Sequence, residues 1–329
     1  MPGWQTVLKK YILFCQETAI CSLFFLTLYG MIYIRNTNYT GWLLIMKKLC
    51  LFLIVLSLLL CGCGKNNDPQ IVASTLPVYE FTSALCQGTG ISVSRLITEE
   101  VSCLHDYTLQ VTQMQAVEAA DVVILNGGGL EDFLGDVLKN TERVIDASKD
   151  VELICAHHHE GHDHAHDPHI WLSPEKAKLM SRTICEELSK LYPAHKDRFE
   201  SNLSALIAKL DALQAYGEAE LSNLKNRNLI TFHDGFSYFA ESFDLHILKA
   251  VEEESGSEAS AKELIEIIDL VKVNDLSAIF TECNGSTAAA KVISAETGST
   301  VYELDMAMAG DSYFDAMYHN IRTVKEALG

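Results

Sequence analysis

Short apolar runs alternate with stretches of helical spacing along residues 64–329. Short apolar runs that are each followed by a helix favour an α/β fold with a mostly parallel sheet. The last helix is predicted from Phe314, Tyr318 and Ile321, which recur at helical spacing and would pack it onto the domain before it. The predicted strands lie at residues 70–74, 91–97, 121–125, 228–232, 247–251, 278–281 and 300–302.

Residues 174–226 contain no strand candidate and are predicted to form a long helical segment. Ser173 followed by proline is typical of a helix start, because serine caps the free N–H groups and proline suits the first turn. Pro193 predicts a break within the segment. Two α/β blocks, residues 64–173 and 227–329, joined in this way predict two lobes that face each other across a cleft.

The N-terminal region contains a predicted secretory signal at residues 46–63. Met46 and two lysines precede the apolar run 49–60, which is too short to cross the roughly 30 Å of a bilayer core. The run ends in Leu-Cys-Gly-Cys, which resembles a bacterial lipobox and makes Cys63 the expected lipidated first residue of the mature protein. A plain membrane anchor with incidental cysteines is the alternative.

Residues 1–45 form a doubtful upstream extension, because a second apolar stretch at residues 19–34 precedes a signal that is already complete. Either the chain has an extra membrane-spanning helix or translation starts at Met46. We favour the start at Met46.

Charge and composition exclude several classes of protein. With 329 residues, 48% of them hydrophobic, the chain is long enough for two cores. A net charge of −19 repels phosphate backbones, so nucleic-acid binding is not expected. The cysteines after Cys63 are odd in number and scattered, which argues against a disulfide framework and a cysteine zinc site. They are Cys86, Cys103, Cys155, Cys185 and Cys283.

Two enzyme motifs fail on inspection. A dinucleotide-binding G-x-G-x-x-G counted from Gly127 needs glycine where Asp132 stands. A metalloprotease H-E-x-x-H counted from His159 needs histidine where Asp163 stands. The simplest dinucleotide-binding and zinc-hydrolase interpretations are therefore disfavoured.

Seven of the twelve histidines lie between His157 and His169, interleaved with carboxylates. Neutral imidazoles are good ligands for zinc, and nearby acids attract cations. Exposed imidazoles with ordinary pKa values should bind metal weakly and lose it on mild acidification. We expect an auxiliary, low-affinity metal-binding loop at residues 157–166 that carries His157, His158, His159, His162, His164 and His166.

Three histidines stand in a different context. His105 and His233 follow predicted strands, and ligands of open α/β sheets gather at the carboxyl ends of strands. His169 lies in an aromatic segment, D-P-H-I-W-L-S-P at residues 167–174. The histidines that lack such company are expected to be solvated or capped, and they are His195, His246 and His319.

Four motifs occur in the order seen in the solute-binding lipoproteins of bacterial zinc and manganese ABC importers, a family that residues 69–329 resemble. They are His105-Asp106-Tyr107, the D-P-H-I-W-L-S-P segment, F-H-D-G-F-S-Y-F at residues 232–239 and G-D-S-Y at residues 310–313. The sequence looks closest to the zinc-binding branch, because a histidine-rich tract precedes the D-P-H-x-W motif and the third ligand position holds histidine.

The resemblance implies a non-enzymatic receptor with two α/β lobes bridged by a long rigid helix. His105, His169 and His233 would bind Zn²⁺, with Asp311 as the fourth ligand. The protein would be a monomer outside the cytoplasm, tethered to the cell membrane by lipid, and would deliver zinc to an ABC permease and its ATPase.

Several alternatives remain open at this stage. The function could be that of a manganese receptor of the same family, a zinc-dependent hydrolase or a surface adhesin with a structural metal. Asp311 could instead be the N-cap of the last helix. Cys103 lies two residues before His105 and could add a soft ligand, with a free thiol as the default.

Overall fold

The computed structural model describes Leu49 and most of residues 71–329, with gaps at single or paired positions and at residues 156–165 and 253–258. Residues 100, 102, 103, 105, 106, 140, 142, 284 and 286 also lie outside the description. The chain divides into two compact units, Met1–Asn66 and Asn67–Gly329. The predicted signal, the lipidated cysteine and the doubtful extension fall in the first unit, of which only Leu49 is described, and the second unit is treated below.

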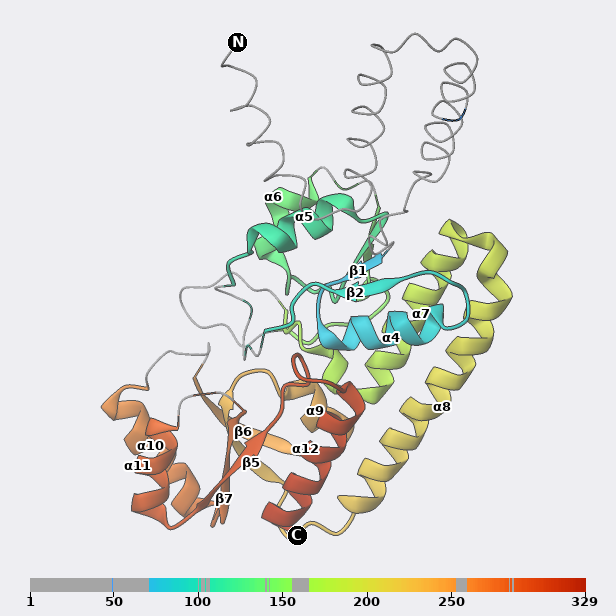
Figure 1. The fold of residues 1–329 in the computed structure, drawn as a ribbon. Helices are drawn as coiled ribbons and strands as arrows, with labels where there is room; N and C mark the ends of the chain where they lie inside the picture. Colours follow the sequence, from blue (N-terminus) through green and yellow to red (C-terminus); the bar gives the residue numbers. More distant parts are fainter. Residues whose placement is uncertain are drawn as a thin grey trace, which may run out of the picture. The chain divides into compact units, whose positions relative to one another are not determined.

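The first half of this unit is built on a four-stranded parallel sheet of order β2-β1-β3-β4 (Figure 1). The central strands β1 and β3 are apolar and almost wholly buried, as expected for a parallel sheet covered on both faces. The strands are β1 (Ile71–Ala73), β2 (Val93–Arg95), β3 (Val122–Leu125) and β4 (Val144–Asp146). The pattern did not predict β4, because only its middle residue is buried.

The second half repeats the arrangement with the order β6-β5-β7-β8, again all parallel. The strands are β5 (Asn228–His233), β6 (His246–Glu252), β7 (Ala278–Glu282) and β8 (Thr300–Leu304). All four lie where the sequence predicted strands, extended by up to two residues at either end. The predicted α/β fold with two lobes is confirmed.

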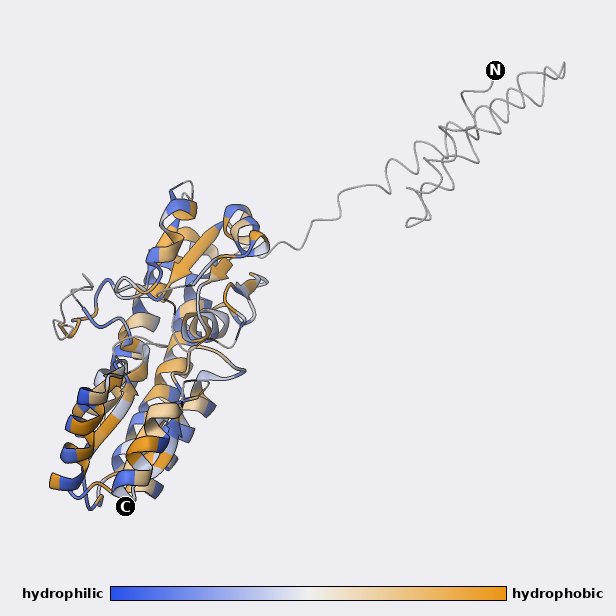
Figure 2. Cartoon of the chain, turned by 90° about the vertical axis from the view of Figure 1, so that its left-hand side faces the viewer, coloured by the Kyte–Doolittle hydropathy of each residue, from blue (hydrophilic) through white to orange (hydrophobic). Residues whose placement is uncertain are grey.

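Helices cover the sheets and carry their polar residues outward (Figure 2). The first lobe has α4 (Leu76–Cys86), α5 (Val111–Ala119), η1 (Asp132–Leu134), α6 (Gly135–Leu138) and η2 (Ile170–Leu172). The second has α9 (Ser237–Ser242), α10 (Ala261–Val273), α11 (Ala288–Thr297) and α12 (Tyr313–Leu328). Among the described helices none is long and apolar enough to cross a membrane.

The helical segment expected at residues 174–226 is two long helices and not one. Helix α7 (Pro174–Leu191) begins where predicted, with the Ser173 hydroxyl accepting a hydrogen bond from the Lys176 N–H at 3.4 Å. A short turn, η3 (Pro193–His195), follows the predicted break and leads into α8 (Lys196–Glu220).

Helix α8 is the bridge between the two sheets. It packs against α7 and α4 of the first lobe and against α12 of the second (Figure 1). Its 25 residues give a length of about 38 Å at the α-helical rise. Leu206, Leu210 and Leu213 of α8 belong to one hydrophobic cluster that contains residues of both lobes. The lobes therefore share a core, and a second cluster lies under α10 and α11.

Cysteines play no part in holding the described fold together by disulfides. Cys86, Cys155, Cys185 and Cys283 are free thiols. Burial raises the pKa of Cys86 to about 12, so this thiol is protonated and inert at neutral pH. Cys103, the possible soft ligand, lies outside the described residues.

Candidate metal site

His169 is buried and held in one orientation by Asp167. Its Nδ1 lies 2.8 Å from Asp167 Oδ1, and its backbone N–H donates to the same oxygen at 2.9 Å. Burial alone would raise the pKa of Asp167, but the charge and hydrogen bonds of His169 outweigh burial and lower it. An ionised carboxylate only accepts hydrogen bonds, so Nδ1 of His169 carries a proton and Nε2 is the nitrogen left to bind a metal.

His233 is the last residue of β5 and is also buried. Its Nε2 lies 3.3 Å from Nε2 of His169, and the two rings meet at 89°. Tetrahedral zinc with Zn–N bonds near 2.0–2.1 Å separates two ligand nitrogens by about 3.3 Å. The pair of imidazoles is therefore spaced as two ligands of one zinc ion would be.

The two histidines come from different lobes, and hydrogen bonds between the lobes hold the segments that carry them close together. Trp171, two residues after His169, donates from Nε1 to the Met306 carbonyl at 2.7 Å. The Tyr313 hydroxyl donates to the Trp171 carbonyl at 2.8 Å. Tyr238 on α9 donates to the Asp167 carbonyl at 2.9 Å, so the segment before His169 is tied to the helix after His233.

The glycine-rich turn after β3 contacts the segment that carries His169. Asn126, at the end of β3, donates from Nδ2 to the Pro168 carbonyl at 3.0 Å. A Cβ on Gly128 would lie 3.3 Å from the Pro168 Cα, so the turn approaches the backbone of the D-P-H motif closely. The turn that failed as a dinucleotide fingerprint therefore helps to position His169.

His105 and Asp106 lie outside the described residues, so the structure does not place this predicted ligand. The neighbouring residues are described: the Tyr107 N–H donates to the Leu104 carbonyl at 3.1 Å, and Leu104 is fully buried. The chain on either side of His105 is thus part of the first lobe's packed structure.

Asp311 is exposed in the turn after β8. The preceding Gly310 carbonyl accepts a hydrogen bond from Arg95 Nη1 at 2.7 Å. The alternative role for Asp311, N-cap of the last helix, is wrong: the cap is Ser312, whose hydroxyl accepts from the Asp315 N–H at 3.3 Å. The structure does not bring Asp311 into a group with the two histidines.

Two carboxyl groups that the sequence did not single out lie at the carboxyl ends of neighbouring strands of the second lobe. Glu282 ends β7, is buried, and places Oε2 3.8 Å from His233 Nδ1. Asp305 follows β8 directly, and its Oδ1 accepts from the Ala307 N–H at 2.7 Å. Their positions in the sequence could have indicated Glu282 and Asp305, since both follow predicted strands as His233 does.

The histidine tract at residues 157–165 lies outside the described residues. Its stem is described: Cys155 and His166 face each other in an antiparallel bridge, and the Asp167 N–H donates to the Ile154 carbonyl at 2.9 Å. The Ile154 N–H in turn donates to the Tyr238 hydroxyl at 2.8 Å. The tract therefore leaves and re-enters the fold directly beside the D-P-H motif.

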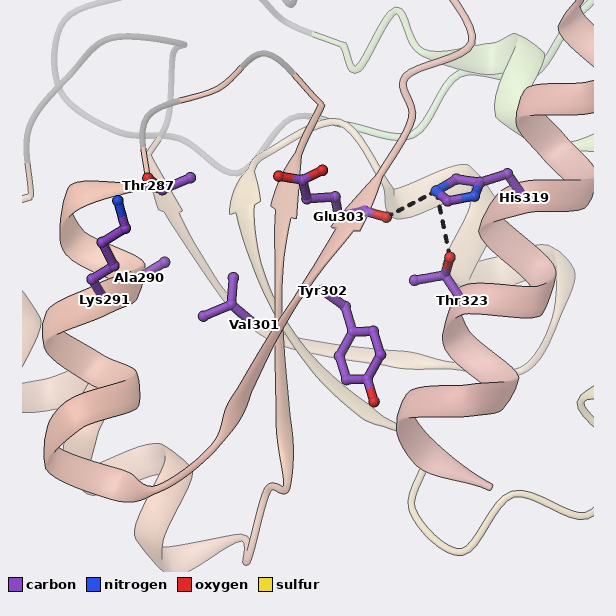
Figure 3. A pocket seen from close by; sticks show the side chains of 8 residues that line it. All are labelled: Thr287, Ala290, Lys291, Val301, Tyr302, Glu303, His319 and Thr323. Carbon is purple, nitrogen blue, oxygen red and sulfur yellow. Dashed lines mark hydrogen bonds between the residues drawn. The ribbon is translucent and has the colours of Figure 1, made fainter.

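A hollow of about 430 Å³ lies elsewhere, between α11, β8 and α12 (Figure 3). His319 on its wall has Nε2 3.2 Å from the Glu303 carbonyl and 3.4 Å from the Thr323 hydroxyl, so this imidazole serves a structural contact, as the sequence suggested. None of the predicted ligands lines the hollow.

Within the part of the chain that the structure describes, no three His, Cys, Asp or Glu side chains are arranged to hold a metal ion. The described part thus supplies two spaced imidazoles, His169 and His233, with carboxyl groups beside their other nitrogens. Each lobe is built on a parallel sheet, and the two lobes bring together imidazoles at the spacing of metal ligands. This combination is that of a metal-binding solute receptor.

The comparisons with known proteins agree with that class. The family described as "Zinc-uptake complex component A periplasmic" (ZnuA) matches residues 71–327, and the chain belongs to this family. Its members are extracytoplasmic metal receptors without enzymatic activity, so the hydrolase hypothesis does not hold.

The chain is 32% identical over 309 residues to the zinc-binding lipoprotein AdcA of Streptococcus pneumoniae, with 85% of this chain and 61% of AdcA covered. It thus spans about three fifths of that relative. Solved structures of two proteins are also similar to this chain. The Zn(II)-bound ZnuA-like domain of S. pneumoniae AdcA has a TM-score of 0.67 and 29% identity, covering 78% of this chain and 98% of that domain. The Mn²⁺ complex of FpvC from Pseudomonas aeruginosa has a TM-score of 0.69 and 29% identity, covering 78% and 97%.

Proposed function

We propose that the protein captures Zn²⁺ outside the cytoplasmic membrane, as a monomer, and delivers it to an ABC permease driven by an ATPase. The observation that carries the proposal is the 3.3 Å spacing between the Nε2 atoms of His169 and His233. Asp167 leaves the lone pair of His169 on the nitrogen that faces His233, so the pair can bind a cation without first changing tautomer.

Zinc is proposed over manganese because the site is rich in nitrogen. Imidazole suits zinc, whereas manganese prefers carboxylate, carbonyl and water ligands. The manganese receptor remains the alternative, since FpvC, which resembles this chain equally well, is a Mn²⁺ complex. An adhesin with a structural metal is the other alternative.

Calorimetric titration of the purified residues 64–329 with Zn²⁺, Mn²⁺ and Ni²⁺ tests the metal. We expect one tight zinc site and weaker manganese binding. Tighter binding of Mn²⁺ would replace zinc by manganese in the proposal. A metal whose removal unfolds the protein would favour the adhesin alternative.

The proposed ligands are His105, His169 and His233, with Asp311 as the fourth. Asp305 competes for the fourth position, because it lies at the carboxyl end of β8, whose neighbour β7 pairs in turn with β5. Zinc affinity of Asp311→Asn and Asp305→Asn decides between them. The ligand's loss should weaken binding tenfold or more, about 1.4 kcal/mol, and the other variant should bind like the wild type.

The N-terminal assignment is also a proposal: translation from Met46, a signal at residues 46–63, a diacylated Cys63, a first lobe at 64–173 and a second at 227–329. Two acyl chains are expected because one gives only marginal membrane binding. Cys63→Ala should release the protein or leave its precursor uncleaved. A mature protein whose intact mass includes residues 1–45 would contradict this assignment.

A further inference from the structure

The side chain of Glu282 is placed against His233 by the sheet itself. Strands β5 and β7 are parallel neighbours, so their last residues, His233 and Glu282, reach the same edge of the second lobe. Both side chains are buried, with 1% and 4% of their surface exposed. Burying a carboxyl group is costly unless it has a polar partner, and here the imidazole provides one.

Glu282 and His169 lie beside different nitrogens of the His233 ring. Glu282 Oε2 is 3.8 Å from Nδ1, while His169 lies 3.3 Å from Nε2. A carboxylate that approaches Nδ1 does not share the metal held at Nε2. Consistent with this, no described carboxyl group joins the two histidines in a three-ligand cluster.

The turn after β7 is shaped to seat this carboxyl group. A Cβ on Gly285 would lie 2.5 Å from Glu282 Cγ and 3.1 Å from its Oε1. Gly285 does not have a positive φ, so its backbone alone does not call for glycine. Its lack of a side chain instead leaves the space that Glu282 occupies.

The first lobe shows the same relation in a tighter form. Asp167 Oδ1 lies 2.8 Å from Nδ1 of His169 and orients that ring. A carboxylate behind a metal-binding histidine fixes its tautomer and raises its basicity. The contact at His233 is looser than the one at His169, because 3.8 Å is longer than a hydrogen bond.

We propose that Glu282 is the positioning residue of His233: its carboxyl group accepts the Nδ1 proton and so keeps the Nε2 lone pair directed at His169. This inference rests on the proposed function, because its consequence is metal binding at Nε2. It gives each of the two histidines a carboxyl partner at Nδ1, one in each lobe.

The experiment that tests the proposal uses metal-free protein labelled with ¹⁵N-histidine, in which NMR reports the tautomer of His233 directly. We expect Nδ1–H in the wild type. Glu282→Met, which keeps the length of the side chain without an acceptor, should lose this preference. Glu282→Gln, whose amide both accepts and donates, should show a mixture of tautomers. A His233 tautomer unchanged in both variants would overturn the proposal.

The zinc affinity of the variants provides the second measurement. The two variants should bind zinc 10- to 100-fold more weakly, the usual cost of removing such a partner, with the metal-free fold intact by circular dichroism. Glu303→Gln is the matched control, because Glu303 is an exposed carboxylate one residue from the end of β8. Should Glu282→Met not fold, Gly285→Ala presses on the same carboxyl group without changing its charge, and it should shift the tautomer too.

The failure of this inference is distinct from that of the proposed function. Wild-type protein that binds no zinc would contradict the function and leave the tautomer measurement, made without metal, unaffected. Wild-type protein that binds zinc tightly while both Glu282 variants bind it equally well would contradict the positioning role alone.

Discussion

A histidine binds a metal through whichever nitrogen carries no proton, and in this protein the residue that decides this lies two positions away. Asp167 accepts from both the backbone and Nδ1 of His169, which a neutral asparagine could not do as well. Asp167→Asn offers an amide N–H₂ that can donate to Nδ1 and turn the Nε2 lone pair into an N–H. The orientation of one side chain thus controls whether the site exists.

Asp167→Asn should therefore weaken zinc binding by 10- to 100-fold while the fold persists. Competition with a fluorescent zinc chelator measures the affinity. Asp211→Asn is the control, because Asp211 is a largely exposed carboxylate on α8 that forms an ion pair with Lys178. Equal affinity of wild type and Asp167→Asn would refute the tautomer argument.

A second buried carboxyl group makes stability depend on pH. Glu131 accepts hydrogen bonds from the Ser74 hydroxyl and the N–H groups of Asn126 and Gly127, at 2.5, 2.8 and 3.1 Å. Burial nevertheless raises its pKa from 4.5 to about 7. Between these values the folded protein keeps a proton that the unfolded chain releases, so the free energy of unfolding falls as pH rises through this window.

The loss should approach about 3 kcal/mol between pH 4.5 and 7, as 2.5 pKa units correspond to this energy. Glu131→Gln carries no titrating proton and should flatten that part of the curve, whereas the exposed Glu326→Gln should leave it unchanged. Urea unfolding at several pH values measures the slope. A wild-type slope that survives in Glu131→Gln would show that other groups cause it.

At the residue scale the sequence predicts candidate ligands, whereas the groups that support them depend on the fold. His169 was predicted from its motif, and His233 from its motif and its place after a strand; the structure brings the two side chains together. Glu282 was not predicted, because its role depends on β5 and β7 being neighbours, and 49 residues separate the two partners. The fourth ligand was assigned to Asp311 from its motif, yet the structure leaves that side chain exposed.

At the scale of elements, the carboxyl ends of parallel strands collect the site. The pattern predicted seven strands from their short apolar runs, which are typical of buried parallel strands. It missed β4, where Val144 and Asp146 are exposed on either side of a buried Ile145. The break in the long helical segment was predicted from Pro193, but the return of α8 along α7 is a matter of packing that no local pattern contains.

The described stem of the histidine tract lies beside the D-P-H motif. Its stem, residues 154 and 167, is closed by a backbone hydrogen bond and by Tyr238. Because the stem does not depend on the tract's side chains, the histidines can be changed without moving His169. This makes the proposed auxiliary role testable in isolation.

Replacing the tract histidines by serine should lower the number of zinc ions bound per chain and keep one tight site. The replaced residues are His157, His158, His159, His162, His164 and His166. Calorimetry gives both stoichiometry and affinity. The wild type should lose its weak sites on mild acidification, since protonated imidazole binds no metal. Loss of the tight site together with the tract would mean that the ligand assignment is incorrect.

At the scale of the whole unit 67–329, the two lobes are joined by a shared core and by polar contacts of one segment of the second lobe, residues 306–313. The backbone carbonyls of Met306, Met308 and Gly310 accept hydrogen bonds from the first lobe, and the Tyr313 N–H donates to Glu80 Oε1 at 3.0 Å. Because α8 packs against α4 and α7 of the first lobe and against α12 of the second, the lobes should unfold together in one transition.

A metal shared by His169 and His233 adds a link between lobes to this structure. A ligand that binds only the folded protein stabilises it by about 4 kcal/mol at a thousand times its dissociation constant, so saturating zinc should raise the melting temperature by several degrees. Differential scanning calorimetry should show one transition that moves as a whole. His233→Ala should lose most of the zinc-dependent shift, whereas His246→Ala, which removes an exposed histidine at the start of β6, should retain it. Two separate transitions, of which zinc moves only one, would contradict a site built from both lobes, because an ion bound within a single lobe stabilises that lobe alone.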